Sequence, residues 1–200
     1  GTTVSIVNLD TQQIVGTITV DLAPAALALS RDGKFLYCLN YVDGNPGTGT
    51  LNVIDTSSNT IVATVTGFSG PFDIALTKCG ATAYVTNFGS NNFTPVNTTV
   101  SVVDLSTYEI VKTINVGLQP AGIAICGCRA YVTNYNSLYS GQQLSPGQGT
   151  INIIDLKCNK VVPNSTIVVG QSPANIVCTK TRAYVSNFTG NTVSVIEFTD

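Results

Sequence analysis

The sequence predicts an all-β fold assembled from repeated four-stranded units. The first observation is a four-residue motif that recurs along the chain, with its tyrosines 47, 47 and 53 residues apart. The copies are Tyr37–Asn40 (YCLN), Tyr84–Asn87 (YVTN), Tyr131–Asn134 (YVTN) and Tyr184–Asn187 (YVSN). An aromatic residue follows every copy: Tyr41, Phe88, Tyr135 and Phe188. A period in the forties is typical of stacked supersecondary units.

The second observation is that each repeat divides into four short runs with strand character, named here A to D. Strand A follows a proline, and strand B is the tyrosine motif. Strand C begins at a threonine and alternates apolar with polar residues, as in TVSVVD from Thr99, and strand D is the β-branched run after it. Period-2 alternation and short turns, such as the Asp-Gly turn after Arg31, predict antiparallel hairpins. Strand D of the last full repeat, VVPNSTIVV, is less regular.

Four antiparallel strands in about 45 residues fit a β-propeller blade better than a helical solenoid. At this point the chain resembles the YVTN β-propeller repeats, over residues 3–198 and through its paired AYVTN and TVSVVD motifs. The resemblance implies a bacterial or archaeal protein that is secreted or part of a surface layer. More distant relatives, the lactonase-like propellers, include enzymes.

We expect one domain, residues 1–200, of about four blade equivalents, with repeats near 3–49, 50–98, 99–149 and 150–200. The strand order begins with C–D and ends with A–B–C. If the chain ends paired to close a ring, the C strands at Thr3 and Thr192 would compete for one place. We therefore favour the alternative that the chain is a segment of a larger propeller, which the resemblance implies has about seven blades.

Composition narrows the classes of function. Only 10% of residues are charged, against about 25% in typical domains, and the net charge is −2. The chain lacks the basic face that nucleic-acid binding requires, and it lacks the apolar run of a membrane span. The absence of histidine removes the commonest general base and metal ligand. We expect no metal, no cofactor and no catalytic residues.

The six cysteines allow disulfides without requiring them. We interpret Cys126 and Cys178 as occupying equivalent positions in neighbouring repeats, and they are our disulfide candidate if their Cα atoms approach within about 7 Å. The other cysteines are interpreted as buried thiols. The Cys126-Gly-Cys128 spacing does not match a zinc motif.

Alternating strand direction sorts the loops onto two faces. The B–C and D–A loops share one face, which we call the loop face, and the A–B and C–D hairpins share the other. Three B–C loops are insertions of nine, eleven and fifteen residues, whereas the last has four, and no Lys or Arg lies in any B–C or D–A loop. Such amide-rich, aromatic loops resemble protein paratopes and sugar-binding surfaces. The candidate binding residues are Tyr41, Asp43, Asn45, Asn91, Asn92, Phe93, Tyr135, Asn136, Tyr139, Gln142 and Gln143.

The repeated residues themselves have structural interpretations. The motif asparagines are expected to bond nearby backbone and stabilise turns. Asn8, Asp55, Asp104 and Asp155 are expected to cap the C–D turns, and the motif tyrosines to pack between blades.

Three functions stay open on the sequence alone. The first is a non-enzymatic recognition or scaffold propeller, secreted or on the surface of a bacterium or archaeon, which binds protein or glycan through its loop face. The second is a lactonase-like or cofactor-binding propeller enzyme. Against it stand the missing histidine and the scattering of the acids near that face, Asp21, Asp43 and Asp73, over different blades. The third is a structural tile that assembles with copies of itself.

Overall fold

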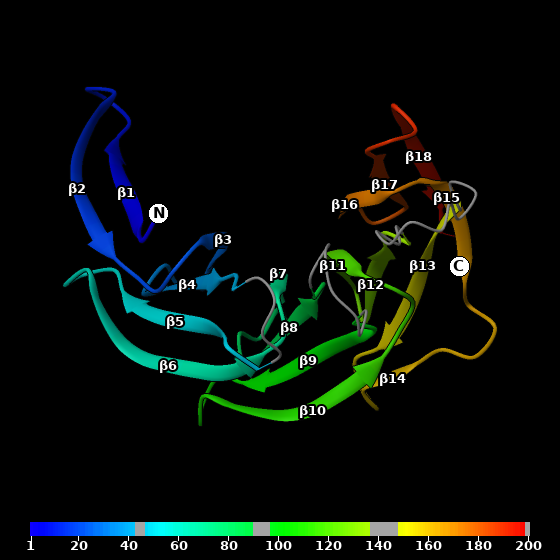
Figure 1. Ribbon diagram of the computed structural model, residues 1–200, viewed down its shortest axis with the longest axis horizontal. Helices are drawn as coiled ribbons and strands as arrows, with labels where there is room; N and C mark the ends of the chain where they lie inside the picture. Colours follow the sequence, from blue (N-terminus) through cyan, green and yellow to red (C-terminus); the bar gives the residue numbers. More distant parts are fainter. Residues whose placement is uncertain (43–46, 90–96, 137–147, 199–200) are drawn as a thin grey trace.

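The computed structural model describes residues 1–42, 47–89, 97–136 and 148–198, and within these ranges the regular structure is all β. The strands form five antiparallel sheets, which we number I to V (Figure 1). Sheet I holds β1 (Thr3–Asn8) and β2 (Gln13–Thr19), and sheet II holds β3 (Pro24–Leu29), β4 (Phe35–Asn40), β5 (Gly49–Asp55) and β6 (Thr60–Phe68). Sheet III holds β7 (Pro71–Leu76), β8 (Thr82–Asn87), β9 (Thr99–Asp104) and β10 (Glu109–Asn115). Sheet IV holds β11 (Pro120–Cys126), β12 (Arg129–Asn134), β13 (Gln148–Asp155), β14 (Lys160–Val161) and β15 (Ile167–Gln171), and sheet V holds β16 (Pro173–Cys178), β17 (Arg182–Asn187) and β18 (Thr192–Glu197).

The predicted A–B–C–D order is confirmed. Sheets II and III each contain the four strands in that sequence, while sheet I contains only C and D and sheet V only A, B and C. The five sheets stand side by side in an arc that does not close (Figure 1). In sheet IV, strand D is split into β14 and β15, which both pair with β13. The break contains Pro163, whose nitrogen has no hydrogen to donate to a ladder.

Apolar clusters fill the spaces between neighbouring sheets, and the motif tyrosines belong to them. Tyr37 of sheet II lies in one cluster with Leu105 of sheet III, and Tyr84 of sheet III donates a hydrogen bond to Asn159 of sheet IV. Tyr131 of sheet IV stacks on Phe198 beyond sheet V, with ring centroids 4.9 Å apart. The interpretation that these tyrosines pack between blades is therefore confirmed for three of the four copies.

The motif asparagines act mainly across the sheet, and only in part on nearby backbone as expected. Their side-chain amides donate across the sheet to the threonine hydroxyl that opens strand C, at 3.0–3.1 Å. The four pairs are Asn40 with Thr50, Asn87 with Thr99, Asn134 with Thr150, and Asn187 with Thr192. Each amide also donates to the side chain two residues further along strand C. In the described ranges, bonds to backbone occur in two copies: Asn40 donates to the Cys38 carbonyl, and the side-chain oxygen of Asn87 accepts the Ser69 N–H of the D–A connection. The bonds that all four repeats share run to side chains of strand C instead, so the turn-stabilising interpretation does not account for the repeat.

The C–D turns are capped as predicted. The side-chain oxygens of Asn8, Asp55, Asp104 and Asp155 each accept the backbone N–H two residues ahead, at 2.8–2.9 Å. The hydrogen bonds from the Ser57 and Ser106 side chains lower the pKa of Asp55 and Asp104. The backbone bond from Lys157 lowers the pKa of Asp155.

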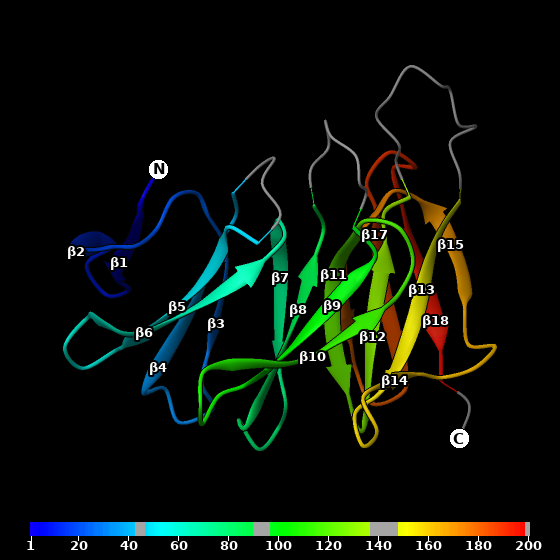
Figure 2. The same ribbon diagram turned by 60° about the horizontal axis from the view of Figure 1, so that its bottom comes forward.

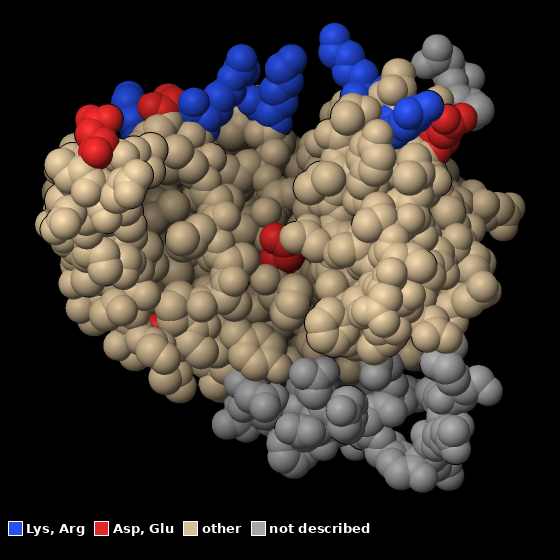
Figure 3. Space-filling view, turned by 90° about the horizontal axis from the view of Figure 1, so that it is seen from above, with Lys and Arg blue, Asp and Glu red and all other residues tan. Residues whose placement is uncertain are grey.

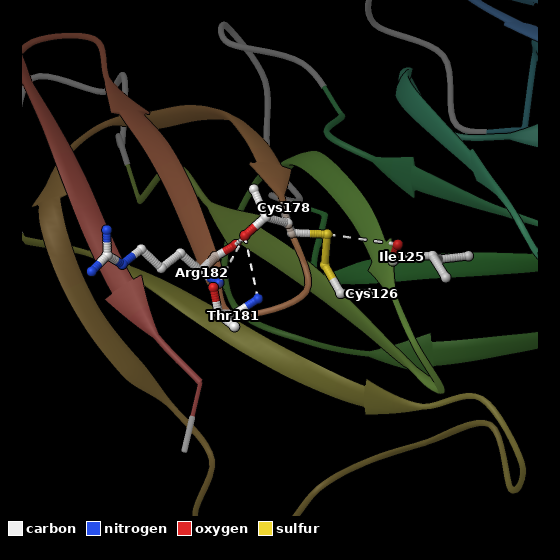
Figure 4. The surroundings of a disulfide bond; sticks show 6 residues. Ile125, Cys126, Cys178, Thr181 and Arg182 are labelled. Atoms are coloured by element: carbon white, nitrogen blue, oxygen red, sulfur yellow. Dashed lines mark hydrogen bonds between the residues drawn. A yellow bond between two sulfur atoms is a disulfide. The ribbon is translucent and has the colours of Figure 1, made fainter. Parts of the chain in front are cut away.

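A disulfide joins sheets IV and V between Cys126 and Cys178, whose Cα atoms are 6.3 Å apart (Figure 4). The interpretation that the two occupy equivalent positions is wrong by one residue. Ile123 and Ile176 are equivalent, because both face the valine of the motif, and Cys126 lies three residues beyond Ile123 while Cys178 lies two beyond Ile176. Since successive side chains of a strand point to opposite faces, this offset turns the two thiols toward one another.

The other four cysteines were expected to be buried thiols, and only one of them is. Cys38 is buried, and burial raises its pKa to about 11. Cys79, Cys128 and Cys158 are exposed, so the interpretation of the other cysteines as buried thiols holds for Cys38 alone. Within the described ranges there is no group of three or more His, Cys, Asp or Glu residues that could hold a metal ion.

Candidate functional site: an aromatic pocket on the loop face

On the loop face, the four D–A connections share one backbone conformation. The residue before each strand-A proline has a positive φ of 50–57°. These residues are Ala23, Gly70, Gln119 and Ser172. A proline disfavours the right-handed helical region for the residue before it, and a left-handed residue turns the chain sharply at this point. The same turn is thus built four times at the entrance to strand A.

The carbonyl of that residue fixes the aromatic residue that follows the motif asparagine. In all four repeats the aromatic backbone N–H donates to it, at 2.9–3.0 Å. The pairs are Tyr41 with Ala23, Phe88 with Gly70, Tyr135 with Gln119, and Phe188 with Ser172. The end of strand B and the D–A connection therefore meet on one face, on the side of the arc away from the A–B hairpins (Figure 2).

These four aromatic side chains line a single pocket of about 540 Å³. Phe72, at the second position of β7, is the fifth aromatic residue of the lining, and Ala23, Pro24, Ala25 and Ala174 complete it. We call these nine residues the aromatic pocket. They belong to sheets II, III, IV and V or to the connections leading into and out of them. Four of them, Pro24, Ala25, Phe72 and Ala174, begin the A strands β3, β7 and β16, which lie on the inner side of the arc (Figure 1). None of these nine residues, all within the described ranges, carries a charged side chain.

Contacts among the aromatic residues hold one wall of the pocket in place. The Phe72 and Phe88 rings stack with centroids 5.1 Å apart, and Tyr135 meets Phe88 edge-on at 5.6 Å. The Tyr41 hydroxyl donates to the Gly89 carbonyl at 2.8 Å, which links sheet II to the loop after β8. Aromatic pairs contribute about 0.5–1.5 kcal/mol each beyond burial of their area. The wall is therefore formed before a ligand arrives.

Three of the predicted binding residues lie within the described ranges, and eight lie outside them. Tyr41 and Tyr135 line the aromatic pocket, and Asn136 follows Tyr135, with its amide 3.4 Å from the Gln148 carbonyl. The other predicted residues lie outside the described ranges: Asp43, Asn45, Asn91, Asn92, Phe93, Tyr139, Gln142 and Gln143.

Sequence analysis missed three of the five aromatic lining residues. Phe88 and Phe188 were visible in the repeat as the aromatic residues after the asparagine, and that regularity could have placed them at the site. Phe72 had a weaker signal, because it stands where the other three repeats have alanine after the proline.

Charge is arranged away from the pocket. The Lys and Arg side chains gather along one edge of the molecule (Figure 3), and eight of the nine lie in A–B or C–D hairpins. The acids Asp21 and Asp73 are engaged in structural bonds: Asp21 accepts from Thr50 and Asn52, and Asp73 accepts the N–H groups of Ile74 and Ile123. Burial raises the pKa of Asp73. Neither carboxylate belongs to the lining.

Comparisons with known proteins support the fold. No protein-family model matches the chain, and no curated protein matches its sequence. Among solved structures, the chain is similar to Kuenenia stuttgartiensis hydrazine synthase, with a TM-score of 0.72 and 20% sequence identity. The match covers 100% of this chain and 61% of that chain, so the protein spans about three fifths of the neighbour's length. At 20% identity the likeness shows the propeller-like fold alone, and the YVTN resemblance rests on the motif residues.

In the part of the chain that the structure describes, no helix is long and apolar enough to cross a membrane.

Proposed function

We propose that the protein is a non-enzymatic recognition and scaffold module of the propeller type, and that it holds its protein or glycan partner at the aromatic pocket. One observation supports this above the others. The four aromatic residues after the motif asparagines, each fixed by the same backbone bond, converge on one pocket whose nine described lining residues are all uncharged. Concave, mostly apolar sites of this size are the usual form of ligand sites.

The lining favours an uncharged ligand group. Flat aromatic walls accept an apolar or aromatic peptide side chain, or the apolar face of a sugar ring. An anionic group would need arginine or another strong donor, and the nine lining residues include none. In the described ranges, no specific observation favours the lactonase-like or cofactor-binding alternative.

The binding test uses Phe72→Ala, because three other repeats carry alanine at this position and the fold accommodates it there. A thermal-shift screen of glycans and peptides first identifies a ligand, which raises the melting temperature with its concentration. We expect Phe72→Ala to weaken binding by about tenfold or more, since truncating an aromatic anchor costs about 2 kcal/mol.

The matched control is Val111→Ala, an exposed apolar residue on β10 outside the aromatic pocket, which should leave the affinity unchanged. Removal of residues 137–147 separates the pocket from the longest predicted loop. Binding that survives Phe72→Ala but is lost with the loop would place the ligand on the loop and contradict the pocket assignment.

We further propose secretion or display on the surface of a bacterium or archaeon. The Cys126–Cys178 disulfide supports this, because such bonds persist in oxidising compartments, as does the low charge. Alkylation of the protein in its source cells tests it: free thiols at Cys126 and Cys178 there would contradict the proposal.

A further inference from the structure

Four asparagines of the chain stand in the pattern Asn-X-Ser/Thr, the sequon for asparagine-linked glycans when X is not proline. They are Asn92, Asn97, Asn164 and Asn187. Asn92 lies outside the described ranges. A glycan is bulky and needs a carboxamide at the protein surface, so the surroundings of the other three decide which of them can carry one.

Two of the three described asparagines already use their amide groups inside the fold. Asn187 is 3% exposed, and its Nδ2 atom donates to the hydroxyls of Thr192 and Ser194 at 3.0 and 2.9 Å. A free carboxamide nitrogen has two hydrogens to donate, and attachment of a sugar removes one of them, so a glycosylated Asn187 cannot make both bonds. Asn97 is half-buried, and its Nδ2 atom donates to the Ser69 carbonyl at 2.9 Å. The folded protein therefore excludes a glycan at Asn187 and disfavours one at Asn97.

Asn164 differs from both because it stands in an exposed turn. It follows Pro163 in the break of strand D between β14 and β15, where both residues are exposed and Asn164 has a φ of 56°. Proline followed by a residue of positive φ is typical of a type II turn. The Ser165 hydroxyl fastens the turn by donating to the Val162 carbonyl at 2.6 Å. Among the described residues, the Asn164 carboxamide has no hydrogen-bond partner, so it is available for modification.

The place of this turn in the fold leaves room for a large group. Both β14 and β15 pair with β13, at the outer edge of sheet IV. The connection between them bulges away from the body of the arc (Figure 2). Thr166, the third residue of the sequon, is exposed as well. The aromatic pocket includes no residue of this connection, so a sugar on the turn leaves the pocket accessible.

We propose that Asn164 carries an asparagine-linked glycan. The donor is a lipid-linked oligosaccharide. A bond forms between C1 of its first sugar and Asn164 Nδ2, the bond from that carbon to the lipid phosphate breaks, and the nitrogen loses one proton as the lipid phosphate leaves. The inference rests on the proposed secretion or surface display, because sequons are used in proteins that leave the cytoplasm.

A glycan at this turn protects a weak point of the sheet edge. Val168, in the edge strand just after the turn, is 58% exposed. An exposed apolar edge strand can pair with the edge of another chain. Only 10% of the residues are charged, so charge gives this edge little protection. A bulky, solubilising sugar beside β15 hinders such pairing.

The test is peptide mapping by mass spectrometry of the protein purified from its source cells. After reduction, trypsin separates the described sequons, because residues 161–180 contain Asn164, residues 183–200 contain Asn187 and residues 79–112 contain Asn97. We expect the first peptide to gain the mass of a glycan, which fragmentation locates at Asn164. An unmodified 161–180 peptide overturns the proposal. A sugar on Asn187 would contradict the argument from its buried amide.

Variants produced in the same cells test whether the sequon directs the modification. Asn164→Gln and Thr166→Ala should each lose the added mass completely. Ser165→Ala is the matched control, since it changes the residue between them and keeps the sequon, and it should retain the glycan. A modification that survives Thr166→Ala is not directed by the sequon and overturns the proposal.

Alkylation of the cysteines separates failure of this inference from failure of the proposed location. A closed Cys126–Cys178 disulfide together with an unmodified Asn164 overturns the glycan and leaves secretion or display standing. Free thiols at both cysteines in the source cells contradict the proposed location itself. In each variant, closure of the same disulfide shows that sheets IV and V have packed correctly.

Discussion

At the scale of single residues, the motif asparagines show how one side chain can hold a sheet together. Each amide bonds two side chains of the neighbouring strand, and all four asparagines are buried. A buried polar group that loses its partner costs about 1–3 kcal/mol. The recurrence of the asparagine therefore has a structural cause, and ligand binding need not explain it.

Replacing Asn87 tests this cause. Asn87→Ala removes the bonds to Thr99 and Ser101 and leaves both hydroxyls without their amide donor. We expect the free energy of unfolding to fall by about 2–3 kcal/mol, measured by urea denaturation. Asn115→Ala, at an exposed position of β10, should change it by less than about 0.5 kcal/mol. Equal effects at the two positions would show that the cross-strand bonds contribute little.

Asp73 and the turn aspartates make the free energy of unfolding depend on pH with opposite signs. Burial raises its pKa above the ordinary 3.8, despite the bonds from Ile74 and Ile123. The folded state therefore favours the protonated carboxyl, and this contribution to stability is lost as the pH rises through the raised pKa. Asp55, Asp104 and Asp155 have lowered pKa values, so their contribution is lost as the pH falls.

The variant Asp73→Asn separates the two effects. Asn175 occupies the equivalent place in β16 and accepts the Ile176 N–H at 2.7 Å, so asparagine fits this geometry. We expect Asp73→Asn to be at least as stable as the unchanged chain at neutral pH. It should also lack the fall in the free energy of unfolding that ionisation of Asp73 causes between acid and neutral pH. Asp73→Ala should instead cost about 1–3 kcal/mol, because two N–H groups lose their acceptor. An unchanged pH profile of the unfolding free energy in Asp73→Asn would contradict this account.

At the scale of elements, the disulfide fastens the A strand of sheet V to that of sheet IV. The crosslinked cysteines are 52 residues apart, and closing a loop of this length constrains the unfolded chain by about 4 kcal/mol in the chain-entropy model. Strand pairing is local within each sheet, whereas this bond acts between sheets. It therefore stabilises the packing of the incomplete sheet V.

Replacement of both cysteines tests the contribution of the bond. We expect Cys126→Ser with Cys178→Ser to lower the free energy of unfolding by about 2–4 kcal/mol, whereas Cys79→Ser, at an exposed free thiol, should have little effect. Alkylation without reductant should label the three exposed thiols in the native protein, and Cys38 only after denaturation. Labelling of all six cysteines without reductant would exclude the bond.

At the scale of the whole molecule, the sheets form a row in which each one packs mainly on its neighbours. Stability in such a row is a sum of unit and interface contributions. Sheets III and IV have neighbours on both sides, while sheet I has one neighbour and lacks its inner strands. The assignment of residues 1–200 to one domain, with the four repeat boundaries, stays a prediction.

Amide hydrogen exchange should show that sheets with two neighbours are more stable than sheet I. We expect the amides of β8, β9, β12 and β13 to be the best protected, and those of β1 and β2 to exchange fastest. Sheet V should lie between them, since the disulfide holds it to sheet IV. Uniform protection across all five sheets would show that the arc unfolds as one cooperative unit.

The sequence by itself determined the strand order, the fold class, the capped C–D turns and the two faces of the arc. These features depend on local patterns, since period-2 alternation, turn residues and a repeated motif are properties of neighbouring residues. The sequence also indicated Cys126 and Cys178 as a disulfide pair. It placed them at equivalent positions, and only the strand pairing showed that they are offset by one residue.

Only the tertiary structure decided which side chains meet across sheets. The cross-strand role of the asparagines, the engagement of Asp73 between two sheets, the convergence of Phe72, Phe88 and Phe188 on one pocket, and the exposure of Leu27 and Val195 all depend on which sheet lies beside which. The physical reason is that these contacts join residues distant in the chain. Burial at such a position is set by the presence of a neighbouring sheet, and the same repeat unit is buried in the middle of the arc and exposed at its ends.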